Sequence, residues 1–390
     1  MIIGIVGKPS SGKSTFFKAA TLADVEIASY PFTTIKPNHG VGFVKVKCVE
    51  SEFDIKCDCK NGYCVDGYRF IPVDMVDVAG LVPGAHTGLG RGNQFLDDLS
   101  NADVLIHILD VSGNTNEKGE AVEGYDVVKD IKWLEEELDM WFLGVIKKGW
   151  EKFVRSLKAQ KTEIIKALAE QLSGLKVDED MVKEVLKELD LGEVENWKDE
   201  ELKKLSNSLR KKSKPMIIAC NKVDIDSKGN FEKVKKEFKD YLVIACSSES
   251  ELALKEASKK ELIDYVPGDK KFKVKGELSE EQEKGLEFIK KVIDKYGSGV
   301  QDVLDKSVFE FLKYIVVYPV ENSKLEDKNG NKLPDAFLMK EGSTALDLAF
   351  KIHSDIGESF IKGINMKDKK VVGKDYILKD DDVIEIVSGK

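Results

Sequence analysis

The stretch MIIGIVGKPSSGKST (Met1–Thr15) decides the fold of this chain. A short β-branched run ends in glycine, the next segment matches G-x-x-x-x-G-K-[ST], and the helix-like sequence FFKAATL follows. Glycines let backbone N–H groups close around phosphates, and the N-terminus of the following helix adds positive potential. The pattern therefore predicts a strand, a phosphate-binding loop and a helix. The residues expected to bind nucleotide are Gly7, Lys8, Pro9, Ser10, Ser11, Gly12, Lys13, Ser14 and Thr15.

Two residues of this loop are expected to have roles of their own. The Lys13 ammonium should reach the β- and γ-phosphates, and the Ser14 hydroxyl should bind Mg²⁺. ATPases and kinases share the motif, so this stretch alone predicts a nucleotide-binding protein without naming the base.

Four later apolar runs repeat the form of the first one: FIPVDMVDVAG, ADVLIHILDVSG, PMIIACNKVD and YLVIACSS. Each ends on its carboxyl side in glycine or a polar residue. Open α/β sheets bind their ligands at the carboxyl ends of parallel strands. The sequence therefore predicts a P-loop α/β domain with a mostly parallel sheet and helices on both faces.

The residues after two of these runs favour a triphosphate and a guanine base. In DVAG, the Asp77 carboxylate can hold Mg²⁺ through water, and the Gly80 N–H can meet the γ-phosphate. In NKVD (Asn221, Lys222 and Asp224), the aspartate can accept two hydrogen bonds from the N1–H and the amine of guanine. Adenine offers no such donor pair, and unmatched buried polar groups are costly.

The final run ends at Ser247 and Ser248, which fit the loop whose backbone reads the guanine carbonyl. Four motifs in this order, each at the end of a strand, predict a GTPase. A P-loop kinase is the weaker alternative, because NKVD has no role in such enzymes.

The chain divides into three expected domains. Residues 1–113 and 213–313 form the P-loop domain with trailing helices, residues 114–212 form an inserted helical domain, and residues 314–390 form a small α+β domain. All four tryptophans fall within the insertion, where packing of that unit is a simpler explanation than a docking surface.

Three segments resemble the Obg-related GTPases, specifically the YchF branch in its archaeal and eukaryotic form. They are YPFTTIKPNHG, DVAGLVPGAHTGLGRGNQFLDDL and the C-terminal domain, which resembles a β-grasp, ubiquitin-like TGS domain. The resemblance implies that Thr34 contacts Mg²⁺ in the GTP state. It also implies a ribosome or another translation RNA as partner. A GTP-sensing RNA-binding scaffold, in which slow hydrolysis only resets binding, is the alternative.

The residue after DVAG is Leu81, where many GTPases have a glutamine that positions water. A leucine side chain makes no hydrogen bond, so intrinsic hydrolysis should be slow. In the family that this chain resembles, the residue at this position is hydrophobic and swings away from the nucleotide. His86 and His107 are the candidate proton-transfer groups, because imidazole has a suitable pKa, although a packed histidine in a strand explains His107 at least as well.

Two departures from the family pattern bear on ligands. Some YchF relatives carry glutamate at the position of Asp224 and accept ATP, so the aspartate favours GTP. Ser10 stands where potassium-stimulated relatives have asparagine, and its shorter hydroxyl reaches a monovalent ion less well, which argues against K⁺.

Four cysteines gather in CVESEFDIKCDCKNGYC: Cys48, Cys57, Cys59 and Cys64. Thiolates are good zinc ligands, but structural sites favour pairs two to four residues apart, and no histidine is near. The C-x-C spacing therefore favours reduced cysteines in a hairpin insertion over a zinc site.

The 390 residues carry a formal charge of −9, with 42% hydrophobic residues and a mean hydropathy of −0.28. Basic residues nevertheless gather between 144 and 168 and between 203 and 214, where they predict either RNA contact or solvated helix faces. We find no signal peptide and no membrane-spanning run, and we expect a cytoplasmic protein of undetermined oligomeric state.

Overall fold

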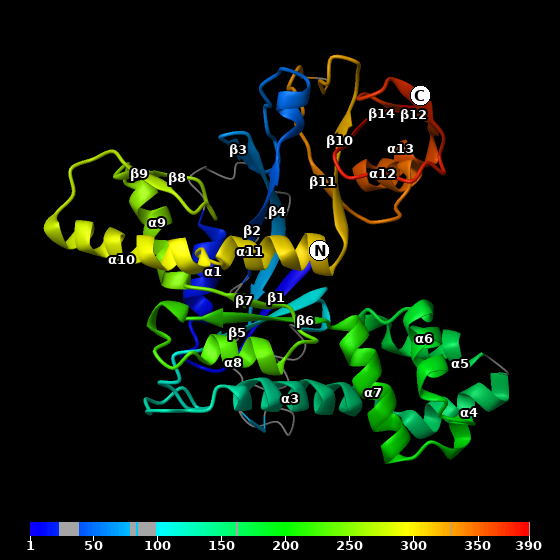
Figure 1. Cartoon of the computed structure of the whole chain (residues 1–390). Coiled ribbons are helices and arrows are strands. Elements are labelled where there is room, and N and C mark those ends of the chain that lie inside the picture. Colours follow the sequence, from blue (N-terminus) through cyan, green and yellow to red (C-terminus); the bar gives the residue numbers. More distant parts are fainter. Residues whose placement is uncertain (23–38, 79–82, 85–98, 161–162, 328, 390) are drawn as a thin grey trace.

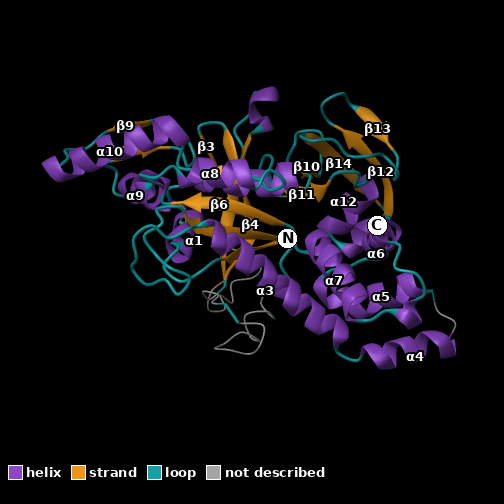
Figure 2. Cartoon of the chain, turned by 60° about the horizontal axis from the view of Figure 1, so that its bottom comes forward, coloured by secondary structure: helices purple, strands orange, loops and turns teal. Residues whose placement is uncertain are grey.

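The structure is a computed structural model, and it describes residues 1–22, 39–78, 83–84, 99–160, 163–327 and 329–389. A central sheet lies between two layers of helices, with a helical unit at one side and a small C-terminal domain at another (Figures 1 and 2). No helix among the described residues is long and apolar enough to span a bilayer.

The central sheet has seven strands in the order β2-β4-β1-β5-β6-β7, and β3 pairs with β4 outside this path. Neighbours from β4 through β7 are parallel, whereas β2 and β3 run antiparallel to β4. The expected mostly parallel sheet is confirmed. The strands are β1 (Ile2–Val6), β2 (His39–Lys47), β3 (Tyr63–Val65), β4 (Tyr68–Asp77), β5 (Val104–Asp110), β6 (Met216–Asn221) and β7 (Val243–Ala245).

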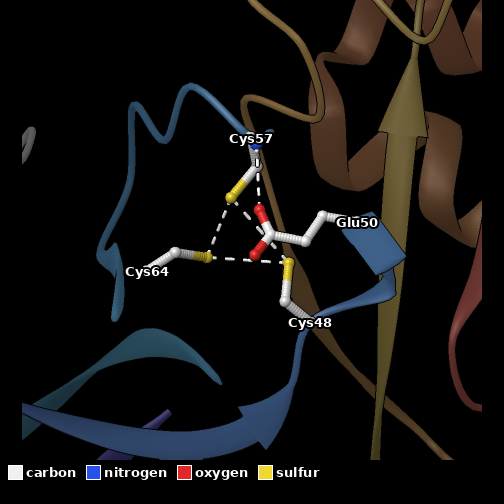
Figure 3. Close-up of side chains that lie close together, drawn as sticks. All are labelled: Cys48, Glu50, Cys57 and Cys64. Carbon is white, nitrogen blue, oxygen red and sulfur yellow. Dashed lines mark hydrogen bonds between the residues drawn. The ribbon is translucent and has the colours of Figure 1, made fainter. Parts of the chain in front are cut away.

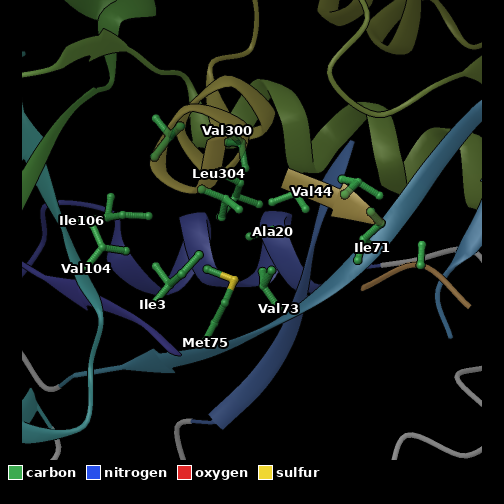
Figure 4. Packing of buried hydrophobic residues seen from close by; sticks show 14 of the residues in the cluster. Ile3, Ala20, Val44, Ile71, Val73, Met75, Val104, Ile106, Val300 and Leu304 are labelled. Atoms are coloured by element: carbon green, nitrogen blue, oxygen red, sulfur yellow. The ribbon is translucent and has the colours of Figure 1, made fainter. Parts of the chain in front are cut away.

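Helices cover both faces of this sheet because its strands are apolar on both sides. One face packs on α1 (Lys13–Thr21), α9 (Ser248–Lys259) and α11 (Val300–Asp305). Alternate residues of β4 point into this layer, as Figure 4 shows for Ile71, Val73 and Met75. The other face packs on α3 (Val128–Lys147) and α8 (Asn230–Glu237).

The helix α3 joins the sheet to the helical unit. Its Leu134 and Leu138 pack on the sheet, whereas Phe142 and Ile146 belong to the core of the helical unit. Three of the four tryptophans lie in or against that core, and Trp133 lies against the sheet. The other helices of the unit are α4 (Trp150–Gln160), α5 (Ile164–Leu172), α6 (Glu179–Leu189) and α7 (Asp199–Ser213).

A hairpin and two helices lead out of the sheet domain. The segment VPGDKKFKV forms the turn and second strand of the hairpin β8 (Ile263–Tyr265) and β9 (Phe272–Val274). The helix α10 (Glu280–Tyr296) follows, and α11 continues into a π-helical turn, Lys306–Phe311.

The C-terminal domain is a five-stranded sheet, in the order β11-β10-β14-β12-β13, with a helix against it. Thr344 caps that helix, and its side chain accepts a hydrogen bond from the Asp347 N–H. The elements are β10 (Tyr314–Val320), β11 (Phe337–Lys340), α12 (Ala345–Ile352), α13 (Ser354–Glu358), β12 (Phe360–Asn365), β13 (Lys370–Val372) and β14 (Asp382–Ser388).

Candidate nucleotide-binding site

The phosphate loop leaves β1 at Val6 and enters α1 at Lys13. Gly12 has a φ of 93°, and a Cβ there would lie 2.2 Å from the Asn221 side-chain nitrogen. Only glycine fits both the left-handed backbone and the close approach. Gly12 also offers no side-chain cap to α1, so the first N–H groups of the helix stay open to an anion.

The Lys13 ammonium lies inside this loop and donates to the Lys8 carbonyl at 2.6 Å. Burial lowers the pKa of Lys13 to about 8, against the opposing effect of the Asp77 charge. A bound triphosphate would supply negative charge and favour the ammonium form. The geometry therefore suits a lysine that neutralises phosphate.

Ser14 and Asp77 meet where a magnesium ion would lie beside the phosphates. The Ser14 hydroxyl donates to Asp77 Oδ2 at 3.3 Å, while Asp77 Oδ1 is buried and has no hydrogen-bond partner among the described residues. Burial raises the pKa of Asp77, so a cation would stabilise its charged form. This hydroxyl and carboxylate fit Mg²⁺, which prefers oxygen ligands. Two further predicted residues, Thr34 and Gly80, lie outside the described residues.

Asn221, at the end of β6, joins three segments of the site. Its amide nitrogen donates to the Ser11 carbonyl at 3.0 Å, and its oxygen accepts from the Ser248 N–H at 3.0 Å and the Ser248 hydroxyl at 2.8 Å. The side chain is only 2% exposed. The phosphate loop, β6 and the start of α9 are therefore held together by one buried amide.

Lys222 ties the same loop to β5. Its ammonium donates to the Ser10 carbonyl at 2.8 Å and to Asp110 Oδ2 at 2.7 Å. Burial alone would raise the pKa of Asp110, but Lys222 and the hydroxyls of Ser112 and Thr115 outweigh it and lower that pKa. Sequence reasoning missed Asp110, although it ends a strand as the predicted polar residues do.

A hollow of about 230 Å³ beside the loop is suited to the base. The Asp224 carboxylate lines it, and no described residue donates a hydrogen bond to that carboxylate. Ser248 also lines the hollow, whereas the Ser247 side chain caps α9 and its N–H donates to the Ser298 carbonyl. The lining residues are Gly12, Thr15, Asn221, Lys222, Asp224, Ile225, Ser248 and Glu249.

The Lys8 ammonium is already engaged by other groups of the chain and is not available to bind phosphate. It pairs with Asp130 at 2.8 Å and donates to the Thr115 carbonyl at 2.6 Å, and both charged side chains are essentially buried. Only the backbone of Lys8 is left for the nucleotide. Sequence reasoning also missed Asp130, whose partner lies far away along the chain.

Of the two candidate catalytic histidines, the structure describes His107 but not His86. His107 lies in β5 beneath the loop, 1% exposed, and neither ring nitrogen has a hydrogen-bond partner among the described residues. Burial, with smaller effects of Lys13 and Lys8, lowers its pKa to about 3, so the ring is neutral at pH 7. His86 and Leu81 lie outside the described residues.

Three protein-family profiles match successive parts of the chain. Residues 2–148 match a 50S ribosome-binding GTPase family, residues 219–322 match an "Obg-like GTPase YGR210-like, G4 motif-containing domain", and residues 329–388 match the TGS domain.

The similarity to known proteins extends over nearly the whole chain. It is 49% identical to an uncharacterized GTP-binding protein of Methanocaldococcus jannaschii over 99% of both chains. A crystal structure of a GTP-binding protein from Pyrococcus horikoshii OT3 is 38% identical, with a TM-score of 0.81 over 100% of both chains. The YchF GTPase of Schizosaccharomyces pombe shares the fold at 20% identity, with a TM-score of 0.60 over 99% of this chain and 97% of the other.

Proposed function

Because this chain belongs to the Obg-like GTPases of the YchF type, with a C-terminal TGS domain, we propose that it hydrolyses GTP as a molecular switch. The reaction is attack of water on the γ-phosphorus, with loss of GDP and release of phosphate. The loop amides, Lys13, Ser14 and Asp77 would hold the triphosphate and Mg²⁺. When bound, the ion would neutralise charge on the β- and γ-phosphates.

The observation that carries this proposal is the Asp224 carboxylate in the hollow beside the phosphate loop. Asn221, fixed by Ser11 and Ser248, holds the end of β6, and Asp224 lies in the 3₁₀ turn that follows it (Val223–Ile225). A carboxylate there accepts from the N1–H and the amine of guanine, and neither donor exists on the same edge of adenine. We therefore expect GTP and GDP to bind at least about 100-fold more tightly than ATP and ADP.

An exchange of donors and acceptors tests the base assignment. Asp224→Asn replaces one acceptor oxygen with a donor, which suits xanthine because its C2 carries a carbonyl oxygen. GDP affinity should fall about 100-fold and xanthosine diphosphate affinity should rise, as titration calorimetry can measure. Glu249→Gln, which changes a carboxylate on the same hollow, is the control and should change neither. Equal binding of GDP and ADP by the native protein would refute the proposal.

A switch needs a partner that distinguishes its nucleotide states, and we propose the ribosome. The matched family over residues 2–148, described as ribosome-binding, and the basic residues of the helical unit support this partner. The stretch 203–214 supports it less than its composition suggests. Arg210 pairs with Asp139, Lys212 with Glu184 and Glu188, and buried Lys214 donates to backbone carbonyls.

The exposed basic residues around α4 are the better candidates for RNA contact. Lys148 and Lys152 are exposed and have no acidic partner among the described residues. Co-sedimentation with ribosomes should depend on the bound nucleotide and weaken steeply as salt rises. Charge reversal of both lysines should release the protein, whereas reversal of Lys204, already paired with Glu200, should have little effect. Ribosome binding that does not depend on the bound nucleotide would favour the RNA-binding scaffold instead.

A further inference from the structure

Four cysteines converge at the far end of the central sheet from the nucleotide site. Cys48 follows β2 and precedes a short 3₁₀ helix (Val49–Glu52), Cys57 and Cys59 lie in the next loop, and Cys64 lies in β3. Pairing of β2 and β3 with β4 brings these separate segments together. Figure 3 shows Cys48, Cys57 and Cys64 pointing toward one another, with Glu50 beside them.

The distances between the sulfur atoms resemble those of a metal–thiolate centre. Cys48 and Cys57 are 3.8 Å apart, Cys57 and Cys59 are 3.6 Å apart, and Cys48 and Cys64 are 3.6 Å apart. A tetrahedral zinc ion with Zn–S bonds of about 2.3 Å places its sulfurs about 3.8 Å apart. The Cys57–Cys64 pair, at 2.9 Å, would have to open. The Cys59 sulfur would have to move closer, because it lies outside the group of ligand atoms within 4.8 Å of one another. We propose that Cys48, Cys57, Cys59 and Cys64 bind a structural zinc ion.

A buried arginine supplies independent evidence for negative charge at this place. Arg69 lies directly opposite Cys64 in the β3–β4 pairing and is 0% exposed. Among the described residues, its Nη atoms donate only to backbone carbonyls, its Nε has no partner, and no carboxylate lies within ion-pair distance. A buried cation without a counter-ion is costly. Four thiolates around Zn²⁺ leave a net negative centre, which provides that counter-ion.

Glu50 is the competing fourth ligand, because its carboxylate lies among the same three sulfurs. We assign the fourth position to Cys59, since thiolates are the softer ligands and Glu50 already accepts a hydrogen bond from the Cys57 N–H at 3.0 Å. A hollow of about 1270 Å³ opens beside Cys57, Cys59 and Cys64 and gives an ion a path from solvent.

The loop that carries Cys57 and Cys59 also contacts the C-terminal domain. The N–H groups of Asp58 and Lys60 donate to the carbonyls of Lys332 and Pro334 at 2.8 and 2.9 Å. Asn61 donates to Asp335 at 2.7 Å, and Arg69 donates to the Leu333 carbonyl at 2.9 Å. Zinc would thus fix the loop on which the C-terminal domain docks.

Metal analysis of the full chain, purified without chelator, tests the site directly. We expect one zinc ion per chain, and the Co²⁺-substituted protein should give the visible absorption of a tetrahedral thiolate site. A thiol titration should find the cluster cysteines protected until a chelator is added. A native chain that takes up neither ion and whose cluster cysteines react without chelator, or a Cys57–Cys64 disulfide, would overturn the proposal.

Single substitutions then assign the ligands. Cys57→Ser and Cys59→Ser should each lose zinc, whereas Cys220→Ala, which changes a buried cysteine of β6, should keep it. Glu50→Gln should keep it too. Loss of zinc in Glu50→Gln with retention in Cys59→Ser would overturn the assignment of the fourth ligand. The cobalt spectrum of the native chain needs no variant, so a variant that fails to fold leaves the test intact.

Hydrogen exchange of the native chain tests the link to the C-terminal domain. Removal of zinc should speed exchange of the Asp58 and Lys60 amides about 10-fold or more and leave the Ser248 amide, held by Asn221, unchanged. Equal exchange with and without zinc would refute the role in docking.

Discussion

The two ends of strand β4 hold buried charge in different ways. At the Asp77 end, Lys8 pairs with Asp130 and Lys222 pairs with Asp110, whereas Lys13 donates to the Lys8 carbonyl. At the other end, Arg69 meets three backbone carbonyls and a group of thiols.

The arrangement of these charges indicates which site is complete without a ligand. The nucleotide end keeps its loops in place through internal amides and ion pairs, and it leaves open only the groups that would meet the phosphates and the base. Within the described part of the chain, the cysteine end provides no carboxylate as a counter-ion for Arg69. We therefore expect nucleotide removal to leave the first site formed and metal removal to loosen the second.

The largest expected effect comes from Asn221→Ala, which removes the amide that holds the nucleotide end together. Three hydrogen bonds are lost, and the Ser11 carbonyl and the Ser248 N–H lose their partner. GDP affinity should fall about 1000-fold, or about 4 kcal/mol, in titration calorimetry. Ser248→Ala removes one of these bonds and should cost about 10-fold. A small effect of Asn221→Ala would show that this end is not held by internal contacts.

Arg69→Met sharpens the contrast at the cysteine end. The substitution removes the hydrogen bonds to the backbone carbonyls both with and without zinc. Only in the zinc-loaded protein does it also remove the positive charge that balances the negative zinc–thiolate centre. The substitution should lower the free energy of unfolding by about 2 kcal/mol more with zinc than after chelation, and zinc affinity should fall about 30-fold. Arg210→Met is the control, because Arg210 is equally buried and pairs with Asp139. Denaturant unfolding should show the same loss for it in both states.

His107 is the exception at the nucleotide end, a buried titratable group without a described partner. Burial lowers its folded pKa to about 3, and the unfolded ring titrates near 6.5. Between these values the unfolded chain binds the extra proton, so His107 makes stability rise with pH by up to about 1.4 kcal/mol per unit. Its contribution is present above pH 6.5 and is lost as pH falls.

Replacing His107 with leucine should flatten that acid dependence in a series of thermal unfolding curves. GTP turnover at pH 7.5 should stay near the native value, because a neutral, sealed imidazole has no route for a proton. A large loss of turnover with unchanged GTP affinity would restore His107 as a catalytic residue.

Leu81→Ala should have the smallest effect. A leucine side chain cannot orient water, so turnover by the purified protein should be slow and change less than about threefold. The assay is phosphate release with and without ribosomes, and Lys13→Ala provides the inactive reference. A large loss in Leu81→Ala alone would show that the leucine contributes to catalysis.

The fold and the nucleotide end could be predicted because their signals are local. Apolar runs ending in Asp77, Asn221 or Ser247 mark strand ends, and parallel strands bring those ends to one edge. Asp110, the partner of Lys222, and Asp130, the partner of Lys8, were missed because no sequence pattern near either lysine identifies them. They are found only once β5 and α3 are placed.

The cysteine end could not be predicted from spacing. The C-x-C pair argues against zinc when the four cysteines are treated as one segment, but Cys48 and Cys64 arrive from two different strands. The pairing of β3 with β4 then sets Cys64 against Arg69. Ligand spacing rules describe single loops, whereas this cluster is assembled across a sheet.

The continuity of β4 limits how the chain can change in length. Side chains alternate along a strand, so Arg69, Ile71, Val73, Met75 and Asp77 all project from one face. An insertion or deletion of one residue between Arg69 and Asp77 would turn one of these two side chains to the opposite face, away from its cysteines or from its serine. Substitutions can alter the chemistry of either site separately. A change in the length of β4 between the two sites keeps both side chains on the same face only when an even number of residues is inserted or deleted.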